Sequence, residues 1–428
     1  MQGLQRCQPW QIGRNGRIGK TASFGSRETN DAGRSTATQF DALIAPIDRA
    51  TFVNEYFNKT MLHLPGEEGR LDHLLDWQDI DHVLEYNRLE PPRLRLTRAG
   101  KVIDRTLYTH ERRGGRDIDA GATTMLLRQG ATLALGFADD LFPPLRKLGD
   151  HIHEVLGAHI NINAYASWGT QSGFDAHFDH HDVLVLQVRG RKRWRVAEPE
   201  FEKPVLRNHK MPGPVEEKFK FDTILESGDV LYLPRGWWHE ATPLGEESLH
   251  ITIAITCPTA RDVLDWIASR VEQDLVGRTD VPPPSQPEAR KAYFADLLSA
   301  IEAQFDGDIS EDFARSREAE RPATPRFNLA RIGESVPTID RNTIITLASE
   351  KRVDERGKDG TIECVVLGGR EGPCHPPFLP ALRLLRSYRG TSFGELAATL
   401  ADPAQEKGLQ GFVRMLAAGG AVFLEPRE

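Results

Sequence analysis

The stretch HFDHHDVLVLQVRGRKRWRV, residues 177–196, decides the fold of this chain. It opens on a His-x-Asp pair, His177 and Asp179, and His239 follows 62 residues after the first histidine. Residues two apart on a β-strand point to the same side. Two imidazoles and one carboxylate are the ligand set that holds non-haem Fe(II) on one face and leaves other positions open. We therefore predict His177, Asp179 and His239 as the metal ligands and catalytic residues.

A single His-x-Asp pair is weak evidence in a chain with 14 histidines, so the flanking segments matter. Residues 160–167, ININAYAS, alternate with a period of two, as a half-buried strand does. The polar face, which includes Asn163 and Tyr165, is either solvated or turned into a barrel with a polar lumen. Residues 183–188 are predicted as an apolar strand, and residues 228–240, GDVLYLPRGWWHE, as a turn, a short strand and a second turn.

The next predicted strand carries a lysine of interest. A turn is predicted at Arg189-Gly190, and RKRWRV at 191–196 then alternates between arginines on one face and Lys192 with Trp194 on the other. If the arginines are solvated, Lys192 points inward, where it needs an anionic partner such as a dicarboxylate. The alternative is a lysine that reaches the rim of the barrel, and alternation alone does not separate the two.

The last predicted strand covers residues 250–256, HITIAIT, in which His250 and Thr252 alternate with isoleucines. A lone histidine in such a strand is usually a core residue whose hydrogen bonds are satisfied. Here His250 also has a second interpretation, in which it faces the metal side of the barrel.

Two parts of the chain, residues 161–196 and 228–256, resemble the JmjC-type cupin oxygenases of the ribosomal oxygenase group. The resemblance is carried by NINAYAS, HFDHHDVLVLQVRGRKRWRV, GDVLYLPRGWWHE and SLHIT. Those relatives are Fe(II)- and 2-oxoglutarate-dependent protein hydroxylases. The resemblance implies that iron binds the three predicted ligands and that Lys192 pairs with the distal carboxylate of 2-oxoglutarate.

The same resemblance assigns further residues to the co-substrate. Asn163 and Tyr165 lie where the family places additional contacts, and His250 takes a position that faces the site in relatives, although its identity varies among them. Relatives also differ from one another at His180 and His181, and the sequence leaves the role of this pair open.

The fold class implied by the resemblance is α+β, with a double-stranded β-helix (the cupin or JmjC barrel) and flanking helices. We predict the catalytic domain over residues 39–257. Residues 1–38 are rich in Gly, Ser, Thr, Gln and Arg and hold six basic residues against two acidic ones, so a disordered tail is predicted. A mitochondrial transit peptide or a wrongly assigned start codon are the alternatives for this segment.

Residues 258–325 are predicted to contain two amphipathic helices separated by the proline-rich segment VPPPSQP. Apolar stripes of this kind are usually core within one chain. The resemblance instead favours a helical dimerisation region, and we predict a homodimer in which the same patch meets itself. The two stripes consist of Leu264, Ile267 and Val271, and of Phe294, Leu298, Ile301 and Phe305.

Residues 326–428 are predicted as a winged-helix-like domain. The sequence SFGE at 392–395 has the pattern of a capping box that opens a helix, a second helix ends at Gly419-Gly420, and AVFLEP follows as a strand. The segment holds 14 basic and 13 acidic residues, a net charge of +1. DNA-binding modules usually carry a marked basic patch, so a structural or protein-contact role is favoured over nucleic-acid binding.

Composition agrees with a globular protein of two or three domains. The chain has 428 residues, 39% of them hydrophobic, and no apolar run long enough for a membrane helix, so no membrane partner is predicted. The net charge of -8 and a pI of about 6.0 give no general attraction to nucleic acid. Four scattered cysteines without a CxxC motif fit a reducing compartment, and a cytoplasmic location is predicted.

The sequence therefore predicts a peptidyl hydroxylase that uses Fe(II), 2-oxoglutarate as co-substrate and O2. By resemblance, its partner and substrate is a ribosomal protein, hydroxylated on Arg or His. The alternatives are the same chemistry on a ribosomally made peptide or a small molecule, and lysine demethylation of the JmjC type. A non-catalytic cupin binding protein is disfavoured because the three ligands and Lys192 are all present.

Overall fold

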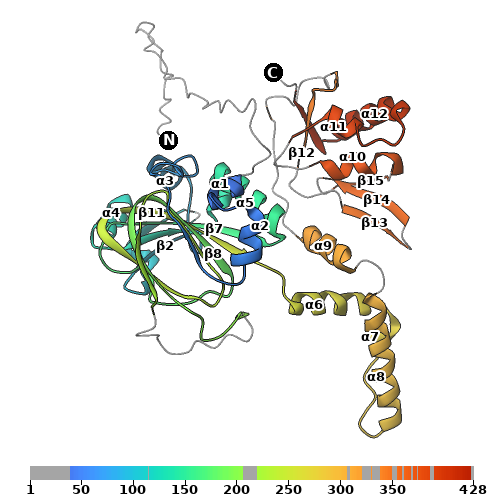
Figure 1. The fold of residues 1–428 in the computed structure, drawn as a ribbon, viewed down its shortest axis with the longest axis horizontal. Helices are drawn as coiled ribbons and strands as arrows, with labels where there is room; N and C mark the ends of the chain where they lie inside the picture. Colours follow the sequence, from blue (N-terminus) through green and yellow to red (C-terminus); the bar gives the residue numbers. More distant parts are fainter. Residues whose placement is uncertain are drawn as a thin grey trace, which may run out of the picture. The chain divides into compact units, whose positions relative to one another are not determined.

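A computed structural model describes most of the chain after residue 38 (Figure 1). The described residues are 39–113, 115–205, 219–305, 309–320, 329, 338–348, 354–358, 361–367, 370–373, 375–385 and 390–425. The tail predicted at residues 1–38 lies outside them.

The part of the chain up to Thr256 contains short helices and a large antiparallel sheet. The first half of this part contains α1 (Gln39–Ile44), α2 (Arg49–Thr51), the π-helical turn η1 (Phe52–Tyr56), β1 (Leu62–Leu64), α3 (Trp77–Tyr86), β2 (Leu94–Arg98), β3 (Lys101–Val102), η2 (Arg105–Leu107), β4 (Thr109–Arg112), β5 (Gly115–Ile118) and α4 (Ala120–Arg128). The second half contains β6 (Thr132–Leu135), η3 (Ala138–Asp140), α5 (Pro143–Leu156), β7 (His159–Ser167), β8 (Asp182–Ala197), β9 (Phe221–Leu225), β10 (Val230–Leu233) and β11 (Trp238–Thr256).

Nine of these strands form one sheet in the order β1-β10-β8-β11-β7-β6-β2-β3, with β9 paired to β8 off this path. Figure 1 shows the long strands β7, β8 and β11 curving around the centre of this part of the chain. The sequence order of β7, β8, β10 and β11 differs from their order in the sheet, because β11 lies between β7 and β8. This arrangement pairs the predicted HITIAIT segment with the predicted ININAYAS strand, from His250 opposite Tyr165 to Ile255 opposite Ile160.

Strand β8 is continuous over 16 residues, whereas the sequence predicted two strands joined by a turn at Arg189-Gly190. That prediction was wrong because Gly190, with a φ of 60°, bends the strand without reversing it. A side chain would not fit there, since an added Cβ would lie 1.8 Å from the carbonyl oxygen of Glu247. Strand β8 can therefore pair with β10 through its first half, with β9 through its second and with β11 along both.

Strand β11 is also longer than predicted. It runs unbroken from Trp238 to Thr256, so His239, which was predicted in a turn, lies on the same strand as His250. Its register with β8 shifts at two places, between Pro243 and Ser248 and between Leu249 and His250. Bulges of this kind bend a strand and re-aim its side chains, which allows one strand to supply residues to two regions of a curved sheet.

The sequence predicted that His177 and Asp179 lie on a strand, and this prediction was wrong, because the segment is not part of a regular strand. His177 forms a single antiparallel bridge with His239, in which each backbone N–H donates to the other residue's carbonyl, at 3.1 and 2.8 Å. The carbonyl of Asp179 accepts a hydrogen bond from the N–H of Gly236 at 2.8 Å. The segment is therefore held by these individual hydrogen bonds, and the three candidate ligands converge through them.

The apolar run of β8 is explained by burial on both faces. Leu184, Leu186 and Val188 belong to the main core, which also includes residues of α1, α3 and α5. The alternate residues, Val183 and Val185, belong to a second cluster inside the curved sheet together with Trp194 and residues of β9 and β10. A strand buried on both faces reads as a continuous apolar run rather than an alternating one.

Beyond Thr256 the chain continues as helices. They are α6 (Ala260–Val271), α7 (Leu275–Arg278), α8 (Pro287–Glu302), the short turn η4 (Ala303–Phe305) and α9 (Ile309–Glu320). The two predicted apolar stripes lie on α6 and α8, but they differ in burial. Ile267 and Val271 are 2% and 4% exposed, whereas Leu264, Phe294, Leu298 and Phe305 are all at least half exposed.

The last part of the chain has a core of its own, which includes Leu409, Phe412 and Val413 of α12. The capping box predicted at residues 392–395 is present, since Ser392 and Glu395 each bond to the other's backbone N–H. The elements are β12 (Ile344–Leu347), β13 (Asp354–Lys358), β14 (Thr361–Leu367), β15 (Arg370–Pro373), η6 (Pro376–Phe378), α10 (Leu379–Leu384), β16 (Thr391–Ser392), α11 (Phe393–Ala397), η7 (Pro403–Gln405), α12 (Glu406–Ala418) and β17 (Val422–Glu425). Strand β12 pairs with both β16 and β17.

None of the helices in the described part of the chain combines the length and the apolar character that a membrane crossing requires.

Candidate active site

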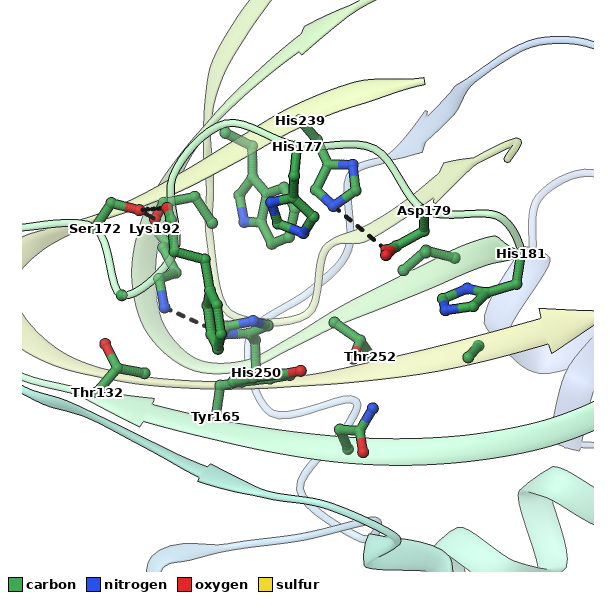
Figure 2. A pocket seen from close by; sticks show the side chains of 17 residues that line it. Thr132, Tyr165, Ser172, His177, Asp179, His181, Lys192, His239, His250 and Thr252 are labelled. Carbon is green, nitrogen blue, oxygen red and sulfur yellow. Dashed lines mark hydrogen bonds and ion pairs between the residues drawn. The ribbon is translucent and has the colours of Figure 1, made fainter. Parts of the chain in front are cut away.

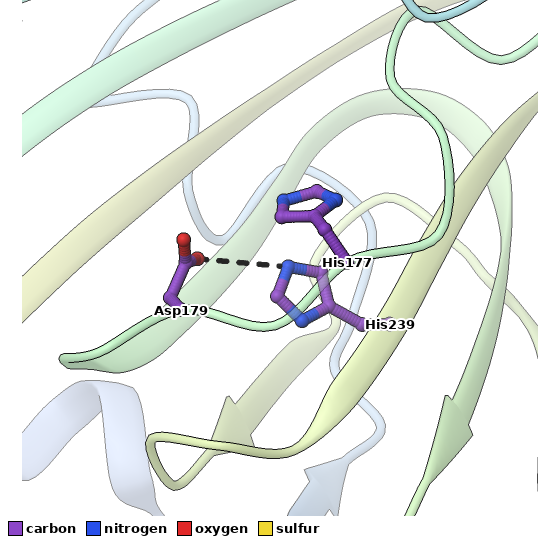
Figure 3. Close-up of side chains that lie close together, drawn as sticks. All are labelled: His177, Asp179 and His239. Atoms are coloured by element: carbon purple, nitrogen blue, oxygen red, sulfur yellow. Dashed lines mark ion pairs between the residues drawn. The ribbon is translucent and has the colours of Figure 1, made fainter. Parts of the chain in front are cut away.

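The three candidate ligands form one cluster. His177 and Asp179 come from the segment before β8, and His239 comes from the start of β11 (Figure 3). One ligand atom from each lies within 4.8 Å of the others. The Nε2 atom of His239 is 3.6 Å from Oδ2 of Asp179, and the two imidazole rings have centroids 4.5 Å apart. The sequence prediction that these residues converge is therefore matched by their positions.

Hydrogen bonds to the backbone orient both imidazoles. Nδ1 of His177 lies 2.7 Å from the carbonyl oxygen of Asp175, and Nδ1 of His239 lies 3.1 Å from that of Trp237. A carbonyl oxygen can only accept, so each Nδ1 carries the hydrogen and each Nε2 keeps its lone pair. Histidine ligands of metals are usually fixed in this way, and the cluster thus offers two nitrogen lone pairs and a carboxylate.

The protonation of the cluster suits a cation. Burial, together with the nearby His177, lowers the pKa of His239 to about 4. Burial raises the pKa of Asp179, but the histidines around it, with His239 first, outweigh this effect and hold the pKa below its ordinary value. At neutral pH, His239 is therefore neutral and Asp179 is ionised, which are the forms that bind a metal.

The cluster forms part of the wall of a cavity of about 250 Å³. Strands β6, β7, β8 and β11 and the segment before β8 supply the rest of the wall. In Figure 2, Lys192, Ser172 and Thr132 lie toward one end of the cavity, and Asp179 and His181 lie toward the other. The cavity therefore extends from the candidate metal ligands to a buried lysine.

Lys192 points inward and is 3% exposed, so it does not reach the rim. Its Nζ donates to Oγ of Ser167 at 3.2 Å and lies 3.4 Å from Nδ1 of His250. Among the described residues, no carboxylate forms an ion pair with it, and burial lowers the pKa of Lys192 to about 7. A buried ammonium without a counter-ion is costly, so this end of the cavity is suited to an anion.

His250 also faces the cavity, next to Lys192. Its ring stacks on that of Tyr165 with centroids 5.0 Å apart, and the Trp194 ring meets it edge-on at 5.7 Å. Burial, followed by the proximity of Lys192, holds the pKa of His250 well below its ordinary value. His250 is therefore a neutral residue whose Nδ1 can accept a hydrogen from the Lys192 ammonium.

Asn163 and Tyr165 line the cavity from β7, so of the two alternatives for the polar face of this strand the structure has the inward one. Burial raises the pKa of Tyr165, so the phenol stays protonated at neutral pH. The Oδ1 atom of Asn163 accepts a hydrogen bond from the N–H of Phe137 at 3.3 Å. His181 lines the cavity as well, and its Nδ1 lies 3.2 Å from the carbonyl oxygen of Asp182.

Several cavity residues were not identified from the sequence. Thr252 could have been found, because it follows His250 by two residues on the same strand face, and so could Ser167, the partner of Lys192, which follows Tyr165 in the same way. Ser172 and Phe174 could not, since they lie in an irregular segment without periodicity.

Comparison with known proteins agrees with this site. Residues 141–263 match the JmjC domain family. The chain is 30% identical over 219 residues to the bifunctional lysine-specific demethylase and histidyl-hydroxylase NO66 of Drosophila mojavensis, across 50% of this chain and 24% of that protein. It is 26% identical over 405 residues to ribosomal oxygenase 1 of Rattus norvegicus, across 91% of this chain and 62% of that protein. The chain thus spans less than two thirds of the length of these relatives.

Solved structures extend the comparison of the fold. The ribosomal oxygenase YcfD of Escherichia coli superposes with a TM-score of 0.56 at 18% sequence identity, across 89% of this chain and 98% of that one. A structure of YcfD with cobalt and 2-oxoglutarate gives the same TM-score at 17% identity, across 89% of this chain and 99% of that one. The antiparallel sheet described above is accordingly a JmjC cupin fold. This chain carries a JmjC domain over residues 141–263 and is a homologue of ribosomal oxygenase 1 and NO66.

Proposed function

We propose that this protein is an Fe(II)- and 2-oxoglutarate-dependent oxygenase that hydroxylates an Arg or His side chain of a ribosomal protein. The observation that carries the proposal is one cavity with a two-histidine, one-carboxylate cluster in its wall and, away from that cluster, a buried lysine that has no carboxylate partner among the described residues. Its homologues are JmjC oxygenases, and YcfD has been solved with cobalt and 2-oxoglutarate.

The cluster is suited to Fe(II). Two imidazole nitrogens and one carboxylate oxygen supply three ligand atoms, and hydrogen bonds to the carbonyls of Asp175 and Trp237 leave the Nε2 atoms of the two imidazoles for a metal. This donor set is typical of non-haem Fe(II) oxygenases, in which the remaining positions are left for the co-substrate and O2. We assign His177, Asp179 and His239 as the iron ligands.

The lysine end of the cavity is suited to the far carboxylate of 2-oxoglutarate. Lys192 supplies the cation, and Ser167 and His250 hold its Nζ in place from β7 and β11. Asn163 and Tyr165, on the same strand as Ser167, line the adjoining wall. A dicarboxylate that reaches from Lys192 to the metal cluster would be held at both ends, and its carboxylate would neutralise the buried ammonium.

When bound, Fe(II), 2-oxoglutarate and O2 supply the oxidising chemistry that places a hydroxyl group on the substrate and releases succinate and CO2. The residues of this chain supply geometry and exclusion of side reactions. Lys192 orients the co-substrate, the three ligands fix the metal beside it, and Trp194 and Phe174 keep part of the cavity wall apolar. A substrate side chain then enters a cavity in which the reacting partners are already oriented.

The substrate class is drawn from the homologues. The relatives are named as a ribosomal oxygenase and as a lysine-specific demethylase and histidyl-hydroxylase. We favour hydroxylation over demethylation of chromatin because residues 326–428 carry a net charge of only +1. We also propose a cytoplasmic location, because the four scattered cysteines fit a reducing compartment.

The test uses the native ribosomal proteins of the source organism. Incubation with the enzyme, Fe(II), 2-oxoglutarate and O2 is expected to add one oxygen, about 16 Da, to one of them, as measured by intact-mass spectrometry. The control is the same incubation without 2-oxoglutarate, which is expected to leave every mass unchanged. A loss of about 14 Da from a methylated protein would identify a demethylase instead. If no ribosomal protein changes mass in the presence of the enzyme, the proposed substrate class is wrong.

We further propose that residues 258–325 mediate a homodimer. Leu264 on α6 and Phe294 and Leu298 on α8 are 59%, 50% and 56% exposed, which is unusual for three large apolar side chains in one helical segment. Ile267 is only 2% exposed within one chain, so it serves the core rather than the predicted interface. The part of the stripe available to a second copy is therefore the exposed one.

The double variant Leu264→Glu with Leu298→Glu is expected to be monomeric, because each new carboxylate would have to be buried in a symmetric interface. Sedimentation velocity at micromolar concentration measures this, with wild-type chain expected as a dimer. Leu107→Glu is the matched control, since Leu107 is also exposed, at 62%, but lies outside the helical segment. A wild-type protein that sediments as a monomer of 47.9 kDa would contradict the proposal.

For the last part of the chain we propose a winged-helix-like domain with a structural or protein-contact role. Helices α11 and α12 and the small sheet of β16, β12 and β17 share one hydrophobic core. Its near-neutral charge supports a protein contact rather than nucleic-acid binding.

A further inference from the structure

The candidate ligands His177 and Asp179 lie on an irregular segment that the sheet holds only weakly, whereas His239 pairs with Val196 of β8. His177 and Asp179 precede β8, and His239 is the second residue of β11, directly after the turn at residues 234–237. The backbone bonds between the two segments are the His177–His239 bridge and the bond from Gly236 to Asp179. Metal ligands must be held within a few tenths of an ångström, so a further support is required.

A buried carboxylate lies where these two segments meet. Asp182 is the first residue of β8, three residues after Asp179, and is 2% exposed. Its Oδ1 accepts a hydrogen bond from the backbone N–H of Arg235 at 2.9 Å, and its Oδ2 accepts one from the hydroxyl of Tyr232. Tyr232 is in turn fixed by the N–H of Asn58, which donates to its hydroxyl at 2.8 Å.

These contacts link the chain before β8 to the chain before β11. Arg235 belongs to the turn whose next residue, Gly236, bonds to Asp179, and whose Trp237 carbonyl accepts from the His239 imidazole. A shift of that turn would therefore change both the orientation of His239 and the support of Asp179. Both oxygens of the Asp182 side chain accept a hydrogen bond, one from the Tyr232 hydroxyl and one from the Arg235 N–H, so Asp182 constrains this turn at two points.

We propose that Asp182 is a positioning residue for the metal centre, which fixes the turn at residues 234–237 against the ligand segment without contacting the metal itself. This inference rests on the proposed function, because it presumes that the three ligands bind a metal. Its physical basis is that the surroundings of metal ligands are fixed by hydrogen bonds, and loss of such a partner typically lowers metal affinity about ten- to a hundredfold.

Asp182→Asn is the decisive variant because it keeps the shape of the side chain. A carboxylate has two acceptor oxygens, one for the Arg235 N–H and one for the Tyr232 hydroxyl, whereas an amide has one acceptor and an NH2 donor. The Arg235 N–H cannot reverse its role, so one conformation of the amide loses that bond and the other forces the Tyr232 hydroxyl to rotate. We expect a Co(II) dissociation constant about ten- to a hundredfold higher than that of the wild type.

The measurement is calorimetric titration of the metal-free full-length chain with Co(II), together with the visible absorption of bound Co(II), which reports its coordination geometry. Asp229→Asn is the matched control. Asp229 is also a buried carboxylate beside β10, 5% exposed, and accepts from the N–H groups of Gly66 and Glu226 at 2.9 and 3.1 Å. It lies at the opposite end of β10 from Arg235, so we expect Asp229→Asn to lower thermal stability without changing the affinity for Co(II) or its spectrum.

The outcomes separate the inference from the proposed function. An Asp182→Asn protein that is folded and binds Co(II) as the wild type does overturns the inference, as does an equal loss of affinity in Asp229→Asn. If Asp182→Asn does not fold, Tyr232→Phe removes only the hydroxyl that bonds to Asp182, and a raised dissociation constant in that variant supports the inference whereas an unchanged one overturns it. A wild-type chain that binds no Co(II) contradicts the proposed metal site itself.

Discussion

Replacing His177, Asp179 or His239 by alanine is expected to reduce 2-oxoglutarate turnover at limiting Fe(II) to the background of the assay. Each residue supplies one of the three ligand atoms that lie within 4.8 Å of one another, and among the described residues no other group of three histidine, cysteine or acidic side chains lies close enough to hold a metal. If one ligand is removed, only two ligand atoms remain, and they bind the metal more weakly and no longer form the three-ligand face that the chemistry requires. Succinate formation measures the effect.

The same three variants are expected to remain folded, because the cluster lies in the wall of a cavity and outside the main hydrophobic core. Circular dichroism and the thermal midpoint of each variant check this. His110→Ala is a suitable control, since His110 is an exposed histidine on β4 that does not line the cavity. Wild-type turnover in any one of the three ligand variants would show that its ligand assignment is wrong.

Period-two alternation correctly grouped the residues that share a face on β7 and on β8. It placed Asn163 with Tyr165 on one face of β7 and Lys192 with Trp194 on one face of β8, and the structure turns both faces toward the cavity. The arginines of β8 lie on the other face, where Arg193 pairs with Asp222 at the surface. The choice between an inward lysine and one at the rim required the structure, since alternation fixes a face but not a depth.

The errors of prediction concern where strands end. A glycine after an arginine was interpreted as a turn, yet the positive φ of Gly190 produces a bend within β8. Likewise His239 was assigned to a turn that precedes the strand of His250, because bulges in β11 interrupt the alternation without ending the strand. Turn residues and bulge residues are the same types, so only the pairing partners distinguish them.

Side-chain contacts between residues that are far apart in the chain could not be predicted from the sequence either. Asp182 was part of the quoted motif, but nothing in its neighbours indicated a contact with Tyr232, fifty residues later. The stripes of α6 and α8 show the same limit, because helical periodicity does not tell whether Ile267 is covered by its own chain and Leu264 is left exposed.

Lys192→Ala is expected to raise the apparent KM for 2-oxoglutarate by about ten- to a hundredfold, because a charge-assisted contact to a carboxylate is worth roughly 1.5–3 kcal/mol. Lys192→Arg is expected to raise it much less, since the guanidinium keeps the charge although its shape differs. Asn163→Ala and Tyr165→Phe are expected to have smaller effects of the same kind. Steady-state kinetics at saturating Fe(II) measure these values, and an unchanged KM in Lys192→Ala would remove the lysine from the co-substrate site.

The charge of Lys192 also predicts how binding of 2-oxoglutarate depends on pH. Burial lowers the pKa of Lys192 to about 7, so the amine is protonated below that pH and increasingly neutral above it. The carboxylate requires the protonated form, so the dissociation constant is expected to be flat below pH 7 and to rise above it, approaching about tenfold per pH unit. His250 lies beside Lys192 and Tyr165 stacks on His250, and both stay neutral over this range.

Lys192→Arg tests the origin of this dependence, because a guanidinium keeps its proton throughout the range. Anaerobic calorimetric titration of the Fe(II)-loaded protein with 2-oxoglutarate between pH 6 and 9 is expected to show a rising dissociation constant in the wild type and a flat one in Lys192→Arg. Titration at pH 8 in buffers of different ionisation enthalpy is expected to show proton uptake on binding in the wild type alone. A wild-type dissociation constant that does not change with pH, or one that rises equally in Lys192→Arg, would show that the lysine is already protonated before the co-substrate arrives.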